Sequence, residues 1–285
     1  TGTGAGNYTL NKTTLTGTGT IARRALTLGA VAAQSKTYDG TTNADTSKFG
    51  AVLNNVVAGE ENSVKATASG ATYNSKDVAT AGTVGYTGVA LTGAEAGNYT
   101  LAATTAQGAG TITRRALTVD TVAAQSKTYD GTTAADTSKF QATLGNLVAG
   151  EENSVTATAS GATYNDKNVA RANRIDYTGV ALTGADAGNY SIAATTAQGA
   201  GSITRRALTL DVAAQSKIYD GTAAADATKF RAALGNAIEG DSVAAAAAGA
   251  AYNDKNVAAA NRIDYTGVAL AGADAGNYSL AATTA

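Results

Sequence analysis

The sequence has 285 residues and a net charge of −1, and it contains no Pro, Cys, Met, Trp or His. The missing His and Cys exclude a Ser-His-Asp triad, a cysteine nucleophile, disulfide bonds and a zinc site of His or Cys ligands. The balanced charge argues against nucleic acid as a partner, and no apolar run is long enough for a membrane span. Without Met, the chain is expected to be a mature or internal part of a longer protein.

Internal repetition organises the whole sequence. The segment RRALT begins at Arg23, Arg114 and Arg205, at a spacing of 91 residues. A unit of this length exceeds a solenoid repeat of about 20–50 residues and suits an independently folding domain. The sequence therefore predicts tandem domains like beads on a string, divided into 1–22 (the tail of a preceding repeat), 23–113 (repeat 1), 114–204 (repeat 2) and 205–285 (repeat 3, without its final strand).

Each repeat opens with the two arginines of RRALT. The pattern favours an exposed boundary strand whose arginines are solvated at a sheet edge. The alternative is an ion pair between domains, formed with Glu151, Glu152 or Asp186.

The tripeptide Tyr-Asp-Gly follows RRALT in every repeat. Gly accepts a positive φ and Asp can bond its own backbone, so the pattern predicts a turn. The Tyr ring is expected to be buried in its own repeat with its hydroxyl at the rim. We favour this structural role over a ligand or metal contact for Tyr38, Asp39, Gly40, Tyr129, Asp130, Gly131, Tyr219, Asp220 and Gly221.

Alternation of apolar and polar residues predicts strands through the middle of each repeat. Residues 154–164 and 174–182 alternate clearly, and 135–146 favours a strand over a short helix capped by Asp136. The Ala-rich residues 242–253 align with 154–165 and are read as strand. Repeat 3 loses two residues beside the counterpart of 150–153, which predicts a turn there. The regular spacing of turn residues along each repeat favours an antiparallel β-sandwich.

Asx-rich loops follow these strands and raise the question of calcium. Asn165, Asp166, Asn168 and Asp186 are the weak candidates, and Ser75 in place of Asp166 weakens a shared site. We therefore expect no cofactor. The recurrent Gly-Asn-Tyr is read as structural, through Asn98, Tyr99, Asn189, Tyr190, Asn277 and Tyr278.

Two chemical alternatives remain for these residues. Glu151 and Glu152 are adjacent and would point to opposite faces of a strand, which disfavours an acid–base pair, and no enzyme is expected. A Lys–Asn isopeptide bond from Lys127, Lys139 or Lys167 to Asn189, and at the equivalent positions of the other repeats, would brace a domain that lacks disulfides.

The motifs KTYDGTT, YNDKNVA, YTGVALTGADAGNYS and GSITRRALT, in that order, resemble the YDG and MBG-type repeats. These are bacterial Ig-like modules of large surface or secreted adhesins related to filamentous haemagglutinin. The resemblance implies Ig-like β-sandwich domains that form a non-catalytic stalk or filament outside a bacterial cell. Arg114 and Arg205 stand where such repeats commonly have Pro, which leaves interdomain stiffness open. The alternative is a binding module whose end loops recognise a glycan or host protein.

The two ends of the sequence are complementary. Repeat 3 contains no counterpart of residues 198–204, whereas the segment TGTGTI at 16–21 matches that strand. One explanation is that the 285 residues are a window on a longer array. The other is head-to-tail assembly, in which the leader of one chain completes repeat 3 of the next.

Overall fold

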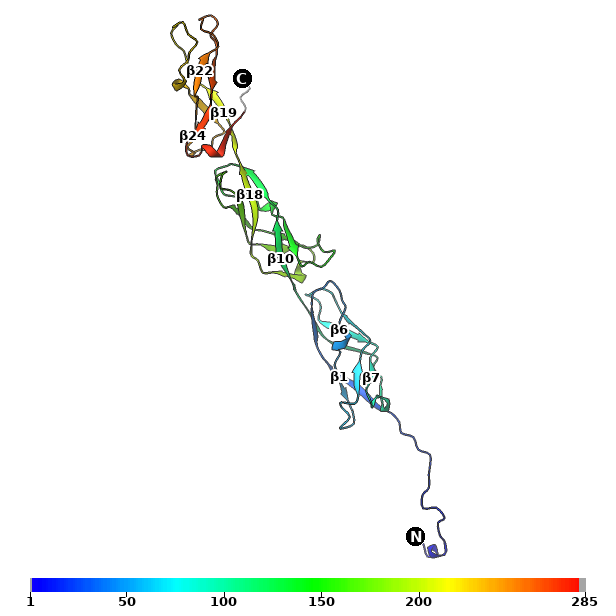
Figure 1. The fold of residues 1–285 in the computed structure, drawn as a ribbon. Helices are drawn as coiled ribbons and strands as arrows, with labels where there is room; N and C mark the ends of the chain where they lie inside the picture. Colours follow the sequence, from blue (N-terminus) through cyan, green and yellow to red (C-terminus); the bar gives the residue numbers. More distant parts are fainter. Residues whose placement is uncertain (1, 282–285) are drawn as a thin grey trace. The chain divides into compact units, whose positions relative to one another are not determined.

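The computed structural model describes residues 2–281, and these form three copies of one β-rich unit (Figure 1). The all-β, tandem fold class is confirmed. The chain divides into two compact units, Thr1–Arg114 and Arg115–Ala285, each described here by itself. The second unit contains both repeat 2 and repeat 3. The end of predicted repeat 3, residues 282–285, lies outside the described residues.

Repeat 1 and repeat 2 have the same nine strands. In repeat 1 they are β1 (Arg24–Val31), β2 (Gln34–Thr37), β3 (Ala51–Asn54), β4 (Lys65–Thr67), β5 (Gly70–Tyr73), β6 (Thr83–Thr87), β7 (Ala90–Thr92), β8 (Tyr99–Leu101) and β9 (Thr105–Thr113). In repeat 2 they are β10 (Arg115–Val122), β11 (Gln125–Thr128), β12 (Ala142–Gly145), β13 (Thr156–Thr158), β14 (Gly161–Tyr164), β15 (Arg174–Thr178), β16 (Ala181–Thr183), β17 (Tyr190–Ile192) and β18 (Thr196–Thr204).

Repeat 3 has fewer strands in its described part. They are β19 (Arg206–Val212), β20 (Ala232–Gly235), β21 (Ala244–Ala246), β22 (Gly249–Tyr252), β23 (Ile263–Thr266), β24 (Ala269–Ala271) and β25 (Tyr278–Leu280). Short 3-10 turns are η1 (Ala5–Asn7), η2 (Thr46–Lys48), η3 (Ala96–Asn98), η4 (Thr137–Lys139), η5 (Ala187–Asn189), η6 (Ala227–Lys229) and η7 (Ala275–Asn277). No helix among residues 2–281 has the length and apolar character to cross a membrane.

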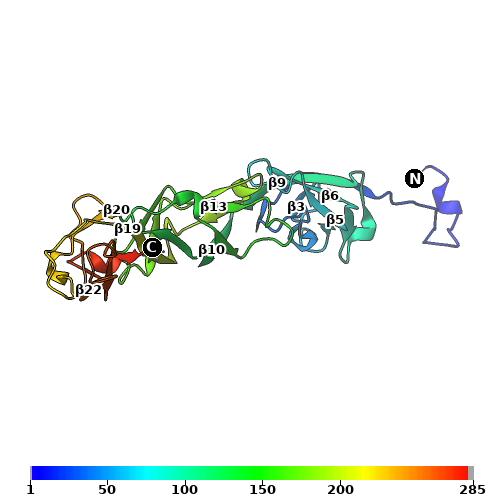
Figure 2. The same ribbon diagram turned by 90° about the horizontal axis from the view of Figure 1, so that it is seen from above.

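The sheets are mixed, which corrects the expected antiparallel pattern. In repeat 2, β12-β10-β17 form one sheet, β11-β18-β15-β14 a second, and β13-β16 a small third. Strands β10 and β17 run parallel, as do β11 and β18. Figure 2 shows the equivalent strands β5, β6 and β9 side by side in repeat 1. Alternation reveals a buried face, but it does not reveal the direction of a partner that is distant in sequence.

The strand predictions hold with one correction. In β15, Ile175 and Tyr177 are fully buried, as the alternation requires. The Ala-rich segment forms β21 and β22, and Gly150 takes a positive φ in the expected turn. Residues 135–146, however, are strand only in their second half. The Asp136 carboxylate accepts a hydrogen bond from the Ser138 backbone N–H and starts the 3-10 turn η4.

The central strand β18 requires glycine because it passes very close to the core. It lies between β11 and β15, with Gly201 opposite Gln125 and Gly199 opposite Ile175. A Cβ atom at Gly201 would lie 2.6 Å from Ile175 Cγ1 and 2.9 Å from Tyr164 Cε1. Ile203 on the same strand is buried, and Phe140 packs on Tyr177 with ring centroids 4.7 Å apart.

Candidate functional site at the junction of repeats 2 and 3

The repeated YDG turn is organised around a lysine. The Lys127 ammonium donates to Asp130 Oδ1 at 2.7 Å and to the carbonyl oxygens of Thr132 and Ala134 at 2.9 Å each. It also lies over the Tyr164 ring, 5.4 Å from the centroid, a cation–π distance. We call Lys127, Asp130, Thr132, Ala134 and Tyr164 the lysine cluster. It fixes the loop so that Tyr129 projects from the end of the repeat.

The same cluster forms in all three repeats. Lys36 bonds Asp39, Thr41 and the Asn43 carbonyl, and Lys217 bonds Asp220, Thr222 and the Ala224 carbonyl. The glycines Gly40, Gly131 and Gly221 have φ values of 77°, 78° and 78°, which confirms the predicted turn. The cluster therefore belongs to the repeat itself and requires no neighbour.

Hydrogen bonds to the turn aspartates stabilise their charged form. Those from Lys217 and Thr222 lower the pKa of Asp220 to about 2. Burial alone would raise the pKa of Asp130, but hydrogen bonds from Lys127 and Thr132 outweigh it and lower that pKa. The carboxylates therefore remain ionised at neutral pH and keep the lysine in place.

Tyr129 joins repeat 2 to repeat 3, which corrects its expected burial within its own repeat. Its hydroxyl donates to Asp241 Oδ2 at 2.9 Å, and Tyr278 donates to the same oxygen at 2.6 Å. The two rings meet edge to face with centroids 5.4 Å apart. Tyr129 is 0% exposed and Tyr278 3%. Burial and then the bond to Asp241 raise the pKa of both phenols, so both donate throughout the neutral range.

Asn277 of the Gly-Asn-Tyr motif makes the second contact across this junction. Its Oδ1 accepts from the Val169 backbone N–H, and its Nδ2 donates to Asn168 Oδ1, both at 2.9 Å. Asn277 is only 4% exposed, so both bonds are shielded from water. The amide thus binds the loop after β14 from across the repeat boundary.

The arginines of RRALT bond backbone carbonyls at this junction. Arg206 donates through Nε to the Asn236 carbonyl at 2.7 Å and through Nη1 to the Tyr129 carbonyl at 3.5 Å. Arg205 donates to the Gly276 carbonyl at 3.1 Å. The alternative of an interdomain ion pair thus has no support from these two side chains, whose contacts are charge-assisted hydrogen bonds to carbonyls.

The calcium candidates are engaged in turn and junction contacts. Asn165 Oδ1 accepts from the backbone of Asn173 and Arg174, and Asp166 Oδ1 accepts from the backbone and side chain of Asn168. Asp186 precedes η5. Within residues 2–281, no group of three or more His, Cys, Asp or Glu side chains could hold a metal ion.

The remaining Gly-Asn-Tyr and YDG residues also occupy structural positions. Tyr99 donates to Glu60 at 2.5 Å and Tyr190 to Glu151 at 2.6 Å, as Tyr278 does to Asp241. Asn189 and Tyr38 are buried, whereas Asn98 is exposed. Burial and the bond to Glu151 raise the pKa of Tyr190 to about 12. The isopeptide alternative has no support for the pair Lys217 and Asn277, which bond different partners.

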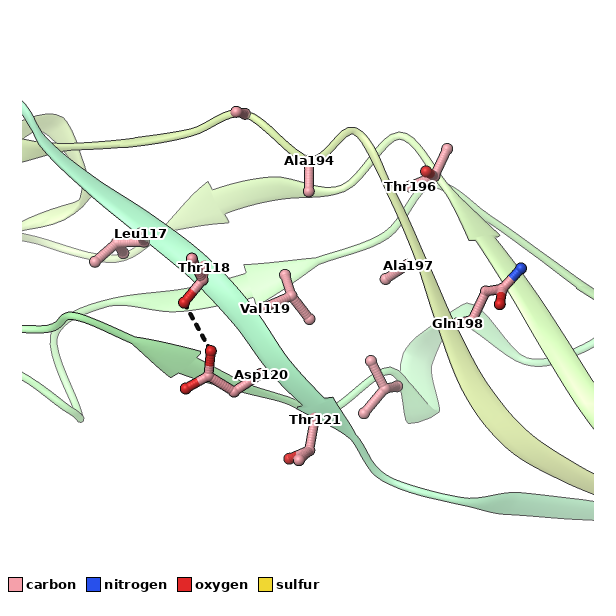
Figure 3. Close-up of a pocket in the computed structure, with 11 residues that line it drawn as sticks. Leu117, Thr118, Val119, Asp120, Thr121, Ala194, Thr196, Ala197 and Gln198 are labelled. Atoms are coloured by element: carbon pink, nitrogen blue, oxygen red, sulfur yellow. Dashed lines mark hydrogen bonds between the residues drawn. The ribbon is translucent and has the colours of Figure 1, made fainter.

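Repeat 2 also carries a small surface groove of about 360 Å³ beside β10 (Figure 3). Short side chains such as Val119, Ala194 and Ala197 line it, and Thr118 donates to Asp120 at 2.7 Å within it. It offers no cluster of convergent ionisable groups, so it is a weak candidate for a ligand site.

Two residues of this site escape the sequence reasoning. The lysine of SKTYDG is considered there only as a partner in an isopeptide bond. Its constant spacing from the Asp of the same motif in all three repeats is a signal for a local contact between the two side chains. Asp241 is not identified there as a contact residue, because repeat 3 lacks two residues at this turn and the correspondence with Glu151 is obscured.

The protein is thus a tandem array of β domains, in which residues of the repeated motifs join repeat 2 to repeat 3. The chain belongs to the YDG domain family, whose model matches residues 22–106, 113–197 and 204–285. Comparisons with curated proteins and with solved structures gave no significant match.

Proposed function

We propose that this chain is a non-catalytic structural segment, a stalk or filament piece of a bacterial surface or secreted adhesin. The observation that carries the proposal is the junction of repeats 2 and 3. Its Tyr129, Asn277 and Tyr278 come from the motifs that every copy repeats, and all three are buried at the boundary between the two repeats. Residues that recur in every copy and connect neighbouring domains are expected in an array that holds other parts of a protein at a distance from each other.

The composition suits the same role outside the cell. A chain without Cys or Met has no sulfur to oxidise, and the YDG-type repeats it resembles occur in exported adhesins. Aromatic residues form 6% of the chain, and most tyrosines of repeats 1 and 2 are buried, so few remain to stack on sugars.

Small-angle scattering and ligand screening test the proposal together. A stalk predicts an elongated particle whose maximum dimension grows by a constant step when repeats are added. It also predicts no specific hit on a glycan array. A compact particle, or a glycan or host protein bound through the end loops, would favour the binding-module alternative.

A further inference from the structure

The chain enters and leaves each of repeats 1 and 2 on strands that run in the same direction. Repeat 2 begins with β10 and β11 and ends with β17 and β18. Three residues of β10 are in parallel register with β17, beginning with Arg115 opposite Tyr190. Four residues of β11 are in parallel register with β18, ending with Thr128 opposite Thr204. Two parallel ladders thus join the entry of the chain to its exit, and we call this pair of ladders the terminal clamp.

The two ladders of the clamp are almost in one register. Arg115 lies opposite a residue 75 positions later, and Gln125 lies opposite a residue 76 positions later. Arg24 and Gln34 have the same two separations in repeat 1, where β1 pairs with β8 and β2 with β9. In repeat 2, one ladder belongs to the sheet β12-β10-β17 and the other to the sheet β11-β18-β15-β14. The entering and leaving strands therefore follow each other along most of the repeat and tie both larger sheets.

Hydrogen bonds secure both ends of the clamp. Where β18 leaves, the Tyr129 N–H donates to the Thr204 carbonyl at 2.9 Å, and the Thr204 hydroxyl donates to the Lys127 carbonyl at 3.2 Å. Where β10 enters, Arg115 Nε donates to the Asn146 carbonyl at 2.6 Å. The equivalent bonds of repeat 1 measure 2.9, 3.3 and 2.7 Å. The exit of the chain is thereby connected to the lysine cluster.

Tension along the chain acts on the clamp in shear. Pulling Arg115 and Thr204 apart moves the entering and leaving strands in opposite directions along their own length. The hydrogen bonds of a ladder lie across the strands, so shear loads all of them together, whereas separating the strands from one end breaks them one by one. Shear needs the larger force, because the bonds share the load and fail together. Residues 129–189 lie in the chain between the two strands, so they carry no tension while the clamp holds.

We propose that the terminal clamp makes repeats 1 and 2 resistant to tension along the chain, and that each repeat opens as a whole only when its clamp breaks. The use of this resistance rests on the proposed stalk function, because a stalk transmits force between the parts that it separates. The resistance itself is a property of the repeat. It is therefore measurable apart from the shape of the chain and from any ligand.

Single-molecule pulling on repeat 1 of the full chain tests the clamp. Repeat 1 lies in a compact unit of its own, and the absence of native Cys makes introduced cysteines unique attachment points. Arg23→Cys with Arg114→Cys places these points just outside β1 and β9 and pulls the clamp in shear. Arg23→Cys with Thr100→Cys places both points at the end where Arg24 pairs with Tyr99, and separates the strands from that end.

The two pulling directions should give different forces. At the same pulling speed, we expect the force that opens repeat 1 to be about twofold or more higher in shear than in separation from one end. In shear the repeat should lengthen in one step of roughly 25–30 nm, which is the extended length of its 91 residues less the length of the folded repeat. All three attachment positions are exposed, so the cysteines leave the core intact.

Two substitutions of buried residues separate the clamp from the rest of the core. Ile112 lies in the clamp strand β9 and is 1% exposed, whereas Val89 lies between β6 and β7 and is 7% exposed. Ile112→Ala and Val89→Ala should both lower the thermal midpoint. Only Ile112→Ala should lower the force measured in shear, because Val89 lies outside the path of tension.

Equal forces in the two pulling directions would overturn the proposal. So would lengthening in several smaller steps in shear, or an equal loss of force in Ile112→Ala and Val89→Ala. None of these results bears on the elongated shape or on the ligand screen, so a failure of the clamp leaves the stalk function to its own test. The comparison of directions uses the unmodified core and therefore does not depend on how well either core variant folds.

Discussion

At the scale of single residues, one tripeptide has two separate roles. Asp130 and Gly131 shape a turn around Lys127 within the repeat, whereas Tyr129 contacts the next repeat. Repeat 3 separates these roles: its lysine cluster is intact although Tyr219 is exposed. The turn is therefore a local structure that presents a tyrosine, and the neighbouring repeat determines whether that tyrosine is buried.

Tyr129→Phe is expected to destabilise the unit of repeats 2 and 3 by about 1–2 kcal/mol, because the buried bond to Asp241 is lost while the ring remains. Tyr219→Phe is the matched control and should change stability by less than about 0.5 kcal/mol. Urea unfolding measures both. Equal effects of the two variants would contradict the junction role of Tyr129.

Alkaline pH should weaken the same junction. Tyr129 and Tyr278 have a raised pKa in the folded chain, whereas an unfolded tyrosine titrates near 10. Their contribution is complete below pH ~10 and decreases above it, because the unfolded state releases its protons first. Urea unfolding between about pH 8 and 11.5 should show a steeper loss of stability for the native chain than for Tyr129→Phe. Parallel curves would show that Tyr129 adds nothing to this pH dependence.

At the scale of elements, β18 decides how each complete repeat closes. It bonds β11 on one side and β15 on the other, and its glycines let the core side chains reach the sheet. Without its counterpart in the described part of repeat 3, residues 214–220 form no strand. Strand β11 has β18 as its pairing partner, whereas β15 also pairs with β14.

Gly201→Val should destabilise repeat 2 by about 3 kcal/mol or more, because its side chain would overlap Ile175 and Tyr164. Ala200→Val, one position away on the exposed face, should be nearly neutral or slightly stabilising, since valine favours strands. Thermal unfolding followed by circular dichroism compares the two. A neutral Gly201→Val would show that β18 does not pack as closely as the core requires.

At the scale of the whole molecule, repeats 2 and 3 are a single compact unit joined by a continuous apolar cluster. Tyr129, Leu208 and Tyr278 belong to this cluster although they come from two repeats. Two domains joined by an open linker make few contacts with each other, whereas repeats 2 and 3 share one apolar cluster.

Calorimetry should therefore detect repeats 2 and 3 unfolding in one transition. Asn277→Ala, which removes both bonds to the loop at Asn168 and Val169, should lower the midpoint and separate the two repeats. Asn253→Ala, within a single repeat, is a control that should lower stability without separating them. Independent transitions in the unmodified chain would contradict the coupling.

The number of repeated units, the all-β class and most turns could be predicted from the sequence. These features depend on period, alternation and local backbone preference, as at Asp130-Gly131 and in residues 174–178. The parallel pairing of β10 with β17 and the contact of Tyr129 with Asp241 are visible in the folded chain alone. Each of these joins residues far apart in the chain, and the free energy that fixes such a contact comes from burial against a partner that no local pattern identifies.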